Sequence, residues 1–259
     1  MSATPLLKID GISKSFGGLR AVHDVSLAIE RGSLTALIGP NGAGKTTLFA
    51  LASGFIPPDA GRVHLDGQDI TGHPPHRNAV LGLTRTFQIV QPFAAQTVRE
   101  NIAVGAHLHL ARRSAALHYA DGIARQVGLE GQLDKLANDL TVAGRKRVEM
   151  ARALATRPRL LLLDEVLAGL NPQEIAEMIP VVRAIAHSGI TVLMIEHVMQ
   201  AVMSLAQHVL VLAQGQLIAQ GTPQDVTSNP AVVEAYLGHG TAERLRKAAA
   251  QAALRESTS

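Results

Sequence analysis

The chain has 259 residues, of which 47% are hydrophobic, so it can bury the core of one large α/β domain. It contains no cysteine, which excludes disulfides, a disulfide-linked partner, thiol catalysis and a cysteine-ligated metal. Lys and Arg number 24 against 21 Asp and Glu, and this net charge of +3 is too small to indicate a nucleic-acid partner.

Short β-like segments dominate the first third of the chain. Alternating or β-branched runs at 6–9 and 25–29, and a further short strand-like run at 62–65, are separated by glycines and turns, which predicts antiparallel hairpins. A compact apolar run, Leu34–Ile38, leads into a glycine-rich loop. A helix should follow this loop and end near Gly54.

The remainder alternates between helices and strands. Residues 95–156 are rich in Ala, Leu, Arg and Glu and lack proline, which predicts an inserted helical lobe. Strands at 160–163, 190–195 and 208–212 then alternate with helices at Pro172–His187 and 198–205, which is typical of a parallel sheet. We therefore expect one α/β domain over 1–240, with a mainly parallel sheet, an antiparallel β part and the helical lobe. The Ala-rich tail, 241–259, is most simply a surface helix.

No apolar run approaches the ~20 residues that a membrane-spanning helix needs. The N-terminal segment reaches Lys8 and Asp10 too early for a signal peptide. We therefore expect the protein to remain on the side of the membrane where it is made.

The glycine-rich loop matches the phosphate-binding pattern G-x-x-x-x-G-K-[ST] at residues 39–46. Glycines allow several backbone N–H groups to face one anion, and the following helix adds its positive end. Lys45, which we place at an exposed loop–helix junction, would contact the β- and γ-phosphates of a bound nucleotide. Thr46 would offer its hydroxyl to Mg²⁺.

Two carboxylates, Asp164 and Glu165, follow the buried strand at 160–163. Ligands of parallel α/β sheets bind at this end of the strands. We expect Asp164 to hold Mg²⁺ through water, and Glu165 to orient and polarise the attacking water. These two motifs alone leave kinases, GTPases and many kinds of ATPase open.

The residues between and after the two motifs resemble the ATP-binding subunits of ABC transporters over nearly the whole chain. The resemblance implies the P-loop NTPase fold of these ATPases, with Gln88 near Mg²⁺ and the lytic water and His197 on the γ-phosphate. It implies a nucleotide site made of Phe16 against adenine and the residues Gly39, Pro40, Asn41, Gly42, Ala43, Gly44, Lys45, Thr46 and Thr47.

The segment at the family's signature departs from its usual L-S-G-G-Q. The chain has Thr141, Val142, Ala143 and Gly144, which by the resemblance would contact the ATP of a second ATPase subunit. Thr141 keeps a hydroxyl that can cap the helix, whereas Val142 and Ala143 replace glycines. The basic run that follows, Arg145-Lys146-Arg147, is most simply a solvated helix face.

Three further phrases narrow the resemblance to importers of branched-chain amino acids: LDGQDITGHPPHRNAVLGLTRTFQ, LAGLNPQE and GTPQDVTSNPAVVEAYLG. The longer of the two ATPase types in these importers is the better match. The resemblance implies a second ATPase subunit, permease subunits docking near 89–104, and indirectly a periplasmic binding protein. It places the chain on the cytoplasmic face of the inner membrane. The ATPase of another export or lipid-transport machine, and a regulatory subunit with weak hydrolysis, remain alternatives.

Overall fold

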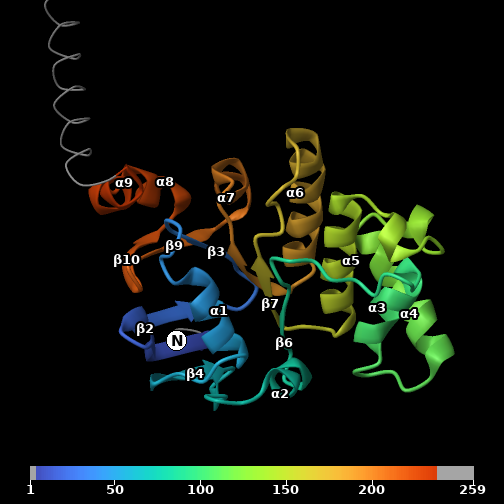
Figure 1. Cartoon of the computed structure of the whole chain (residues 1–259), viewed down its shortest axis with the longest axis horizontal. Coiled ribbons are helices and arrows are strands. Elements are labelled where there is room, and N and C mark those ends of the chain that lie inside the picture. The colour runs from blue at the N-terminus through green and yellow to red at the C-terminus, as the bar shows by residue number, and fades with distance from the viewer. Residues whose placement is uncertain (1–3, 238–259) are drawn as a thin grey trace, which may run out of the picture.

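The computed structural model describes residues 4–237, so the expected tail at 241–259 lies outside the described residues. Two sheets occupy the left and middle of the molecule in Figure 1, and a group of helices forms its right end. Within residues 4–237, none of the helices combines the length and the apolar character needed to cross a membrane.

The larger sheet has six strands in the order β10-β9-β3-β8-β7-β6, parallel except for the β10–β9 pair. Its strands are β3 (Leu34–Ile38), β6 (Leu83–Arg85), β7 (Leu160–Asp164), β8 (Thr191–Ile195), β9 (His208–Ala213) and β10 (Gln216–Gly221). β3, β7 and β8 are buried along their whole length, as expected for parallel strands covered on both faces.

The smaller sheet is antiparallel, with the order β2-β1-β4-β5. It consists of β1 (Leu7–Phe16), β2 (Leu19–Ile29), β4 (Ala60–Leu65) and β5 (Gln68–Asp69). A two-residue turn at Gly17-Gly18 joins β1 to β2 as the expected hairpin, although β2 begins earlier than the predicted segment.

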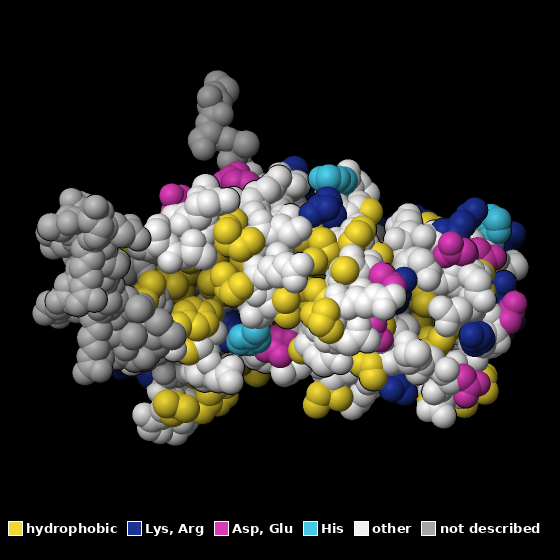
Figure 2. Space-filling model, turned by 90° about the horizontal axis from the view of Figure 1, so that it is seen from above, with side chains coloured by type: hydrophobic (Ala, Val, Ile, Leu, Met, Phe, Trp, Pro, Cys, Tyr) yellow, Lys and Arg dark blue, Asp and Glu magenta, His cyan; other side chains and the backbone are white. Residues whose placement is uncertain are grey.

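The helices pack around and beside the two sheets (Figure 1). They are α1 (Lys45–Ser53), α2 (Pro75–Val80), α3 (Val98–Ala106), α4 (Arg113–Gln126), α5 (Val142–Ala155), α6 (Pro172–His187), α7 (Met199–Leu205), α8 (Pro223–Ser228) and α9 (Pro230–Leu237), with short 3₁₀ turns at Glu130–Gln132 and Ala137–Asp139. α3, α4 and α5 pack together as a helical lobe. Its surface intersperses acidic and basic side chains at the right end of Figure 2.

Alternate residues of the parallel strands enter two separate cores. Leu160 and Leu162 of β7 join α1 and the antiparallel sheet, while Leu161 and Leu163 join α5 and α6 on the opposite face. The helical lobe is therefore packed against the sheet through α5, directly beside the strand that ends in Asp164. The expected fold class, a mainly parallel sheet with an antiparallel β part and a helical lobe, is confirmed.

Candidate functional site

The loop between β3 and α1 needs glycine at both ends. A Cβ on Gly39 would lie 2.0 Å from the carbonyl oxygen of Leu212, and one on Gly44 2.3 Å from that of Ala21. Both residues also have positive φ, 152° and 100°. The loop is therefore pressed against β9 and β2, in a conformation that a side chain at either position would prevent.

Lys45 is buried, which corrects the expectation of an exposed junction: it is only 6% exposed. Its ammonium donates to the carbonyl oxygens of Gly39 (2.8 Å) and Pro40 (2.9 Å), across the loop that it follows. Burial lowers the pKa of Lys45, while the charges of Glu165 and Asp164 oppose that shift. The side chain thus stands inside the loop as a cation already facing two carboxylates.

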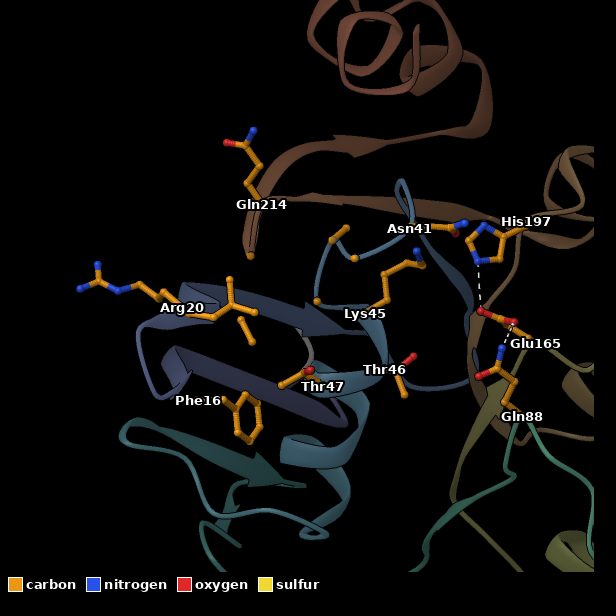
Figure 3. Close-up of a pocket in the computed structure, with 16 residues that line it drawn as sticks. Phe16, Arg20, Asn41, Lys45, Thr46, Thr47, Gln88, Glu165, His197 and Gln214 are labelled. Carbon is orange, nitrogen blue, oxygen red and sulfur yellow. Dashed lines mark hydrogen bonds and ion pairs between the residues drawn. The ribbon is translucent and has the colours of Figure 1, made fainter. Parts of the chain in front are cut away.

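A cavity of about 1080 Å³ opens beside this loop (Figure 3). It brings together residues that the sequence analysis assigned to one site, namely Phe16, Asn41, Gly42, Ala43, Gly44, Lys45, Thr46, Thr47, Gln88, Glu165 and His197. Leu19, Arg20 and Ala21 of β2, and Gln214 and Gly215 of the β9–β10 turn, complete the wall. No motif marked these five residues, because they reach the cavity only through the packing of the two sheets.

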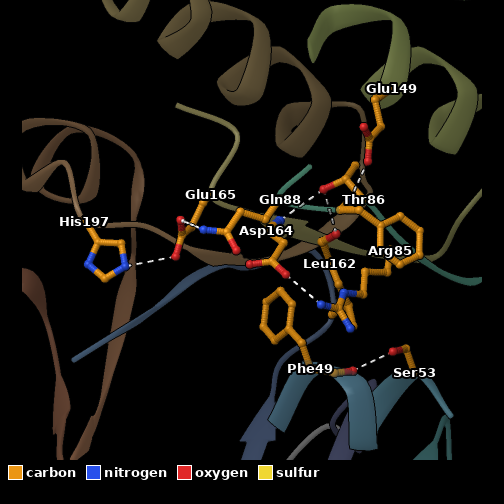
Figure 4. Close-up of polar contacts among 11 residues, drawn as sticks. Phe49, Ser53, Arg85, Thr86, Gln88, Glu149, Leu162, Asp164, Glu165 and His197 are labelled. Atoms are coloured by element: carbon orange, nitrogen blue, oxygen red, sulfur yellow. Dashed lines mark hydrogen bonds and ion pairs between the residues drawn. The ribbon is translucent and has the colours of Figure 1, made fainter. Parts of the chain in front are cut away.

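Glu165 lies on the side of the cavity away from Phe16, where two side chains hold its carboxylate (Figures 3 and 4). Gln88 Nε2 donates to Oε2 at 2.7 Å, and His197 Nε2 lies 3.0 Å from Oε1. A carboxylate only accepts hydrogen bonds, so the histidine contact requires a proton on Nε2. Glu165 has a φ of 50°, a left-handed conformation that is rare for a residue with a side chain.

Asp164 is 1% exposed and pairs with Arg85, whose Nη2 lies 2.7 Å from Oδ2. Burial raises the pKa of Asp164, and its hydrogen bond and ion pair with Arg85 oppose that shift. The second carboxylate oxygen, Oδ1, is buried without a hydrogen-bond partner. Sequence reasoning missed Arg85, since it belongs to a three-residue strand with no pattern of its own.

A neighbouring cavity of about 620 Å³ is lined by Thr46, Gln88 and Asp164, the three side chains predicted to meet Mg²⁺. A hydroxyl, an amide oxygen and an unpartnered carboxylate oxygen are the hard oxygen donors that Mg²⁺ prefers. The donor set therefore fits the ion.

The signature residues begin α5 and do not line the 1080 Å³ cavity. The Thr141 hydroxyl caps the helix by accepting from the Gly144 N–H at 3.1 Å, the role anticipated for it. Val142 is 46% exposed, whereas Ala143 and Gly144 are buried. Only Val142 of the two glycine replacements therefore offers its side chain to another molecule.

The expectation of a solvated basic face on α5 is wrong for Lys146. This residue is 6% exposed, and its ammonium donates to the backbone oxygen of Glu165 at 2.9 Å. Arg147 is also engaged, with Nη2 3.4 Å from Oε2 of Glu177 on α6. Lys146 turns inward because α5 packs against the sheet, which the sequence of the helix does not reveal.

Comparison with known families matches most of the chain. A family model described as "ABC transporter" matches residues 22–168, more than half of the chain. A second model, described as "Branched-chain amino acid ATP-binding cassette transporter", matches residues 216–242.

Named relatives and solved structures agree with these models. The chain is similar to the high-affinity branched-chain amino acid transport ATP-binding protein BraF of Pseudomonas aeruginosa, with 41% identity covering 90% of this chain and 98% of that protein. It is 38% identical to LivG of Escherichia coli over the same shares. A nucleotide-free ATP-binding cassette from an ABC transporter superposes with a TM-score of 0.82 and 34% identity, covering 91% of this chain and 100% of that one.

Proposed function

Because the chain belongs to the ATP-binding family of ABC transporters, we propose that it hydrolyses ATP to drive the import of branched-chain amino acids. The solute is supported by the branched-chain amino acid transport for which BraF and LivG are named and by the family model at residues 216–242. The observation that carries the reaction is the arrangement of Lys45, Glu165 and Asp164 around adjoining cavities.

ATP would be held along the 1080 Å³ cavity. Phe16, which is 49% exposed on the wall opposite Glu165 in Figure 3, would stack on the adenine ring. The loop amides and the N-terminus of α1 would surround the phosphates. Lys45 would exchange its two carbonyl partners for phosphate oxygens, so the ammonium needs only a local rearrangement.

Mg²⁺ would be held by Thr46, Gln88 and the free Oδ1 of Asp164. When bound, the ion would offset negative charge on the β- and γ-phosphates. Arg85 would keep the Asp164 carboxylate fixed by its pairing with the other oxygen. Arg85 thus occupies Oδ2 of Asp164 and leaves Oδ1 oriented for the metal.

Glu165 would accept a proton from the attacking water, with Gln88 and His197 placing its carboxylate. Both partners are within direct hydrogen-bond distance of Glu165 and also line the cavity. On nucleotide binding, His197 would turn its Nε2–H to the γ-phosphate, leaving Oε1 of Glu165 free for water.

The signature residues would act on the ATP of a second ATPase subunit. The permease would dock on the 620 Å³ cavity, whose outer wall carries exposed apolar side chains: Phe87, Ile89, Phe93 and Val104. This placement would make the chain a peripheral subunit on the cytoplasmic face of the membrane, with any periplasmic binding protein acting indirectly.

Uptake of radiolabelled leucine, isoleucine and valine by cells that lack the gene tests this function. The wild-type gene should restore uptake, and the Glu165→Gln variant should not, because an amide cannot act as a base. The Glu130→Gln variant, with the same change at an exposed position, is the matched control. Unchanged uptake of all three amino acids in the deletion strain would contradict the proposed solute.

A further inference from the structure

The turn that carries Glu165 is strained and is held from several directions. Its φ of 50° is costly for a residue with a side chain and persists only where the surroundings fix it. The Glu165 N–H donates to the Ile195 carbonyl oxygen at 3.0 Å, and its own carbonyl oxygen accepts from the Ala168 N–H at 3.2 Å. These backbone bonds tie the turn to β8 and to itself.

Two buried side chains complete this restraint. The Lys146 ammonium donates to the Glu165 carbonyl oxygen at 2.9 Å, and Glu196 Oε1 accepts from the Leu167 N–H at 3.0 Å. Lys146 is 6% exposed and Glu196 only 1%. A cation on α5 and an anion that follows β8 therefore hold the turn at two positions, the Glu165 carbonyl and the Leu167 N–H.

The two charges compensate each other. Burial lowers the pKa of Lys146, and Glu196 is the strongest of the carboxylates that oppose this shift. Burial raises the pKa of Glu196 to about 7, and the Leu167 and His197 N–H groups and Lys146 oppose that shift. Each of these buried side chains also has a hydrogen-bond partner in the turn, as buried charged groups usually do.

Helix α5, which carries Lys146, also acts on the side chain of Glu165. Glu149 of α5 accepts from the Phe87 N–H, next to Gln88, and Gln88 in turn donates to the Glu165 carboxylate (Figure 4). α5 thus contacts both the backbone of Glu165 and the loop that holds its side chain. The N-terminus of α5 carries Thr141 and Val142, which the proposed function assigns to the ATP of the second subunit.

We propose that Lys146, acting with Glu196 on the same turn, is a positioning residue for hydrolysis, which couples the location of α5 to the direction of the Glu165 carboxylate. This inference rests on the proposed role of Glu165 as the base. Displacement of α5 by a nucleotide bound at its N-terminus would move the Glu165 carbonyl group through Lys146. Nucleotide at the second subunit's site would therefore change the direction of Glu165, the base in this chain's own site.

The Lys146→Met variant of the full-length chain tests the proposal, because methionine keeps the apolar stem and removes the donor. We expect the kcat for MgATP to fall about 10- to 100-fold, the cost of a misdirected reacting group, with KM changed less than about 2-fold. Lys146→Arg should stay within about 3-fold of wild type, because a guanidinium still donates. The matched control is Arg147→Met on the same helix, which should change kcat less than about 2-fold.

Hydrogen exchange of the nucleotide-free chain gives a readout without turnover. Lys146→Met should speed exchange of the Leu167 and Ala168 amides at least about 10-fold, while amides of α3 and α4 stay at wild-type rates. Arg147→Met should leave the Leu167 and Ala168 exchange rates unchanged. If Lys146→Met does not fold, Glu196→Gln takes its place and should lower kcat at least about 3-fold without lowering the melting temperature at pH 8.

A kcat within 2-fold of wild type with unchanged amide exchange would overturn the proposal. The proposal would also be overturned if kcat fell and KM rose by equal factors in Lys146→Met and Lys146→Arg behaved in the same way. That result would show that Lys146 has a purely structural role. Wild-type protein that fails to hydrolyse ATP, or Glu165→Gln protein that hydrolyses it normally, would refute the proposed function instead, and the exchange rates would still decide whether Lys146 fixes the turn.

Discussion

The buried pair of Arg85 and Asp164 provides a prediction whose size follows from the structure. The Arg85 side chain is 7% exposed and that of Asp164 1%, so water does not screen the 2.7 Å contact. The guanidinium carbon also lies 5.4–5.8 Å from the ring centres of Phe49, Phe55 and Phe87. Replacing Arg85 with methionine would keep apolar bulk among the rings but leave the carboxylate buried without its counter-charge.

We expect Arg85→Met to lower the free energy of unfolding by about 3–5 kcal/mol at pH 8, the usual cost of removing one partner of a buried pair. In a chain of this size the melting temperature should fall by about 10 °C. The loss should shrink at pH 5. Burial already raises the folded-state pKa of Asp164 and Arg85 opposes that shift, so without Arg85 the folded chain takes up a proton more readily than the unfolded one.

Urea unfolding at pH 5 and pH 8 measures both effects. The double variant Arg85→Met/Asp164→Asn should recover at least half of the lost stability, because it no longer buries an unpaired charge. Arg159→Met, which removes an arginine from an ion pair with exposed Asp66, is the matched control and should have a much smaller effect. A loss below about 1 kcal/mol at pH 8, or one that does not depend on pH, would refute the reasoning.

Three other outcomes are expected. Lys45→Ala should weaken ATP binding about 10-fold, measured by calorimetry. This is the low end of the range for a charge-assisted hydrogen bond, because the ammonium gives up two carbonyl partners when it binds phosphate. Equal ATP affinities of the variant and the wild type would contradict the assignment of Lys45 to the phosphates. Val142→Gly should speed hydrolysis at the partner subunit's site in the assembled dimer, because Val142 is exposed at the start of α5. Ala143→Gly, at a buried position, should leave that rate unchanged and lower the free energy of unfolding by about 0.5–1 kcal/mol. Equal rate gains for the two variants would contradict this distinction. Burial raises the pKa of Glu196 from 4.5 to about 7, so its contribution to stability is complete below pH 4.5, and about 3 kcal/mol is lost as the pH rises from there through 7. Glu196→Gln should flatten this decrease of the unfolding free energy with pH in urea unfolding, and an unchanged decrease would exclude Glu196 as its source.

Contiguous sequence alone determined the fold class and the phosphate loop. Fully apolar runs such as Leu160–Leu163 indicate parallel strands, because only strands covered on both faces bury every side chain. The loop at 39–46 could be recognised because its geometry is local: glycines, a lysine and a helix start stand next to one another in the chain. Asp164 and Glu165 were likewise placed by the strand that they follow.

Tertiary structure alone decided what surrounds those residues. Arg85 meets Asp164 across neighbouring strands β6 and β7, and β6 is too short to leave a periodic signal. Lys146 looked like part of a solvated basic face and proved to be buried against the Glu165 carbonyl. The charge of a side chain is written in the sequence, but its burial and its partner depend on which elements pack over it. The environment that sets the pKa of Asp164 and the direction of Glu165 therefore exists only once α5 and the sheet have come together.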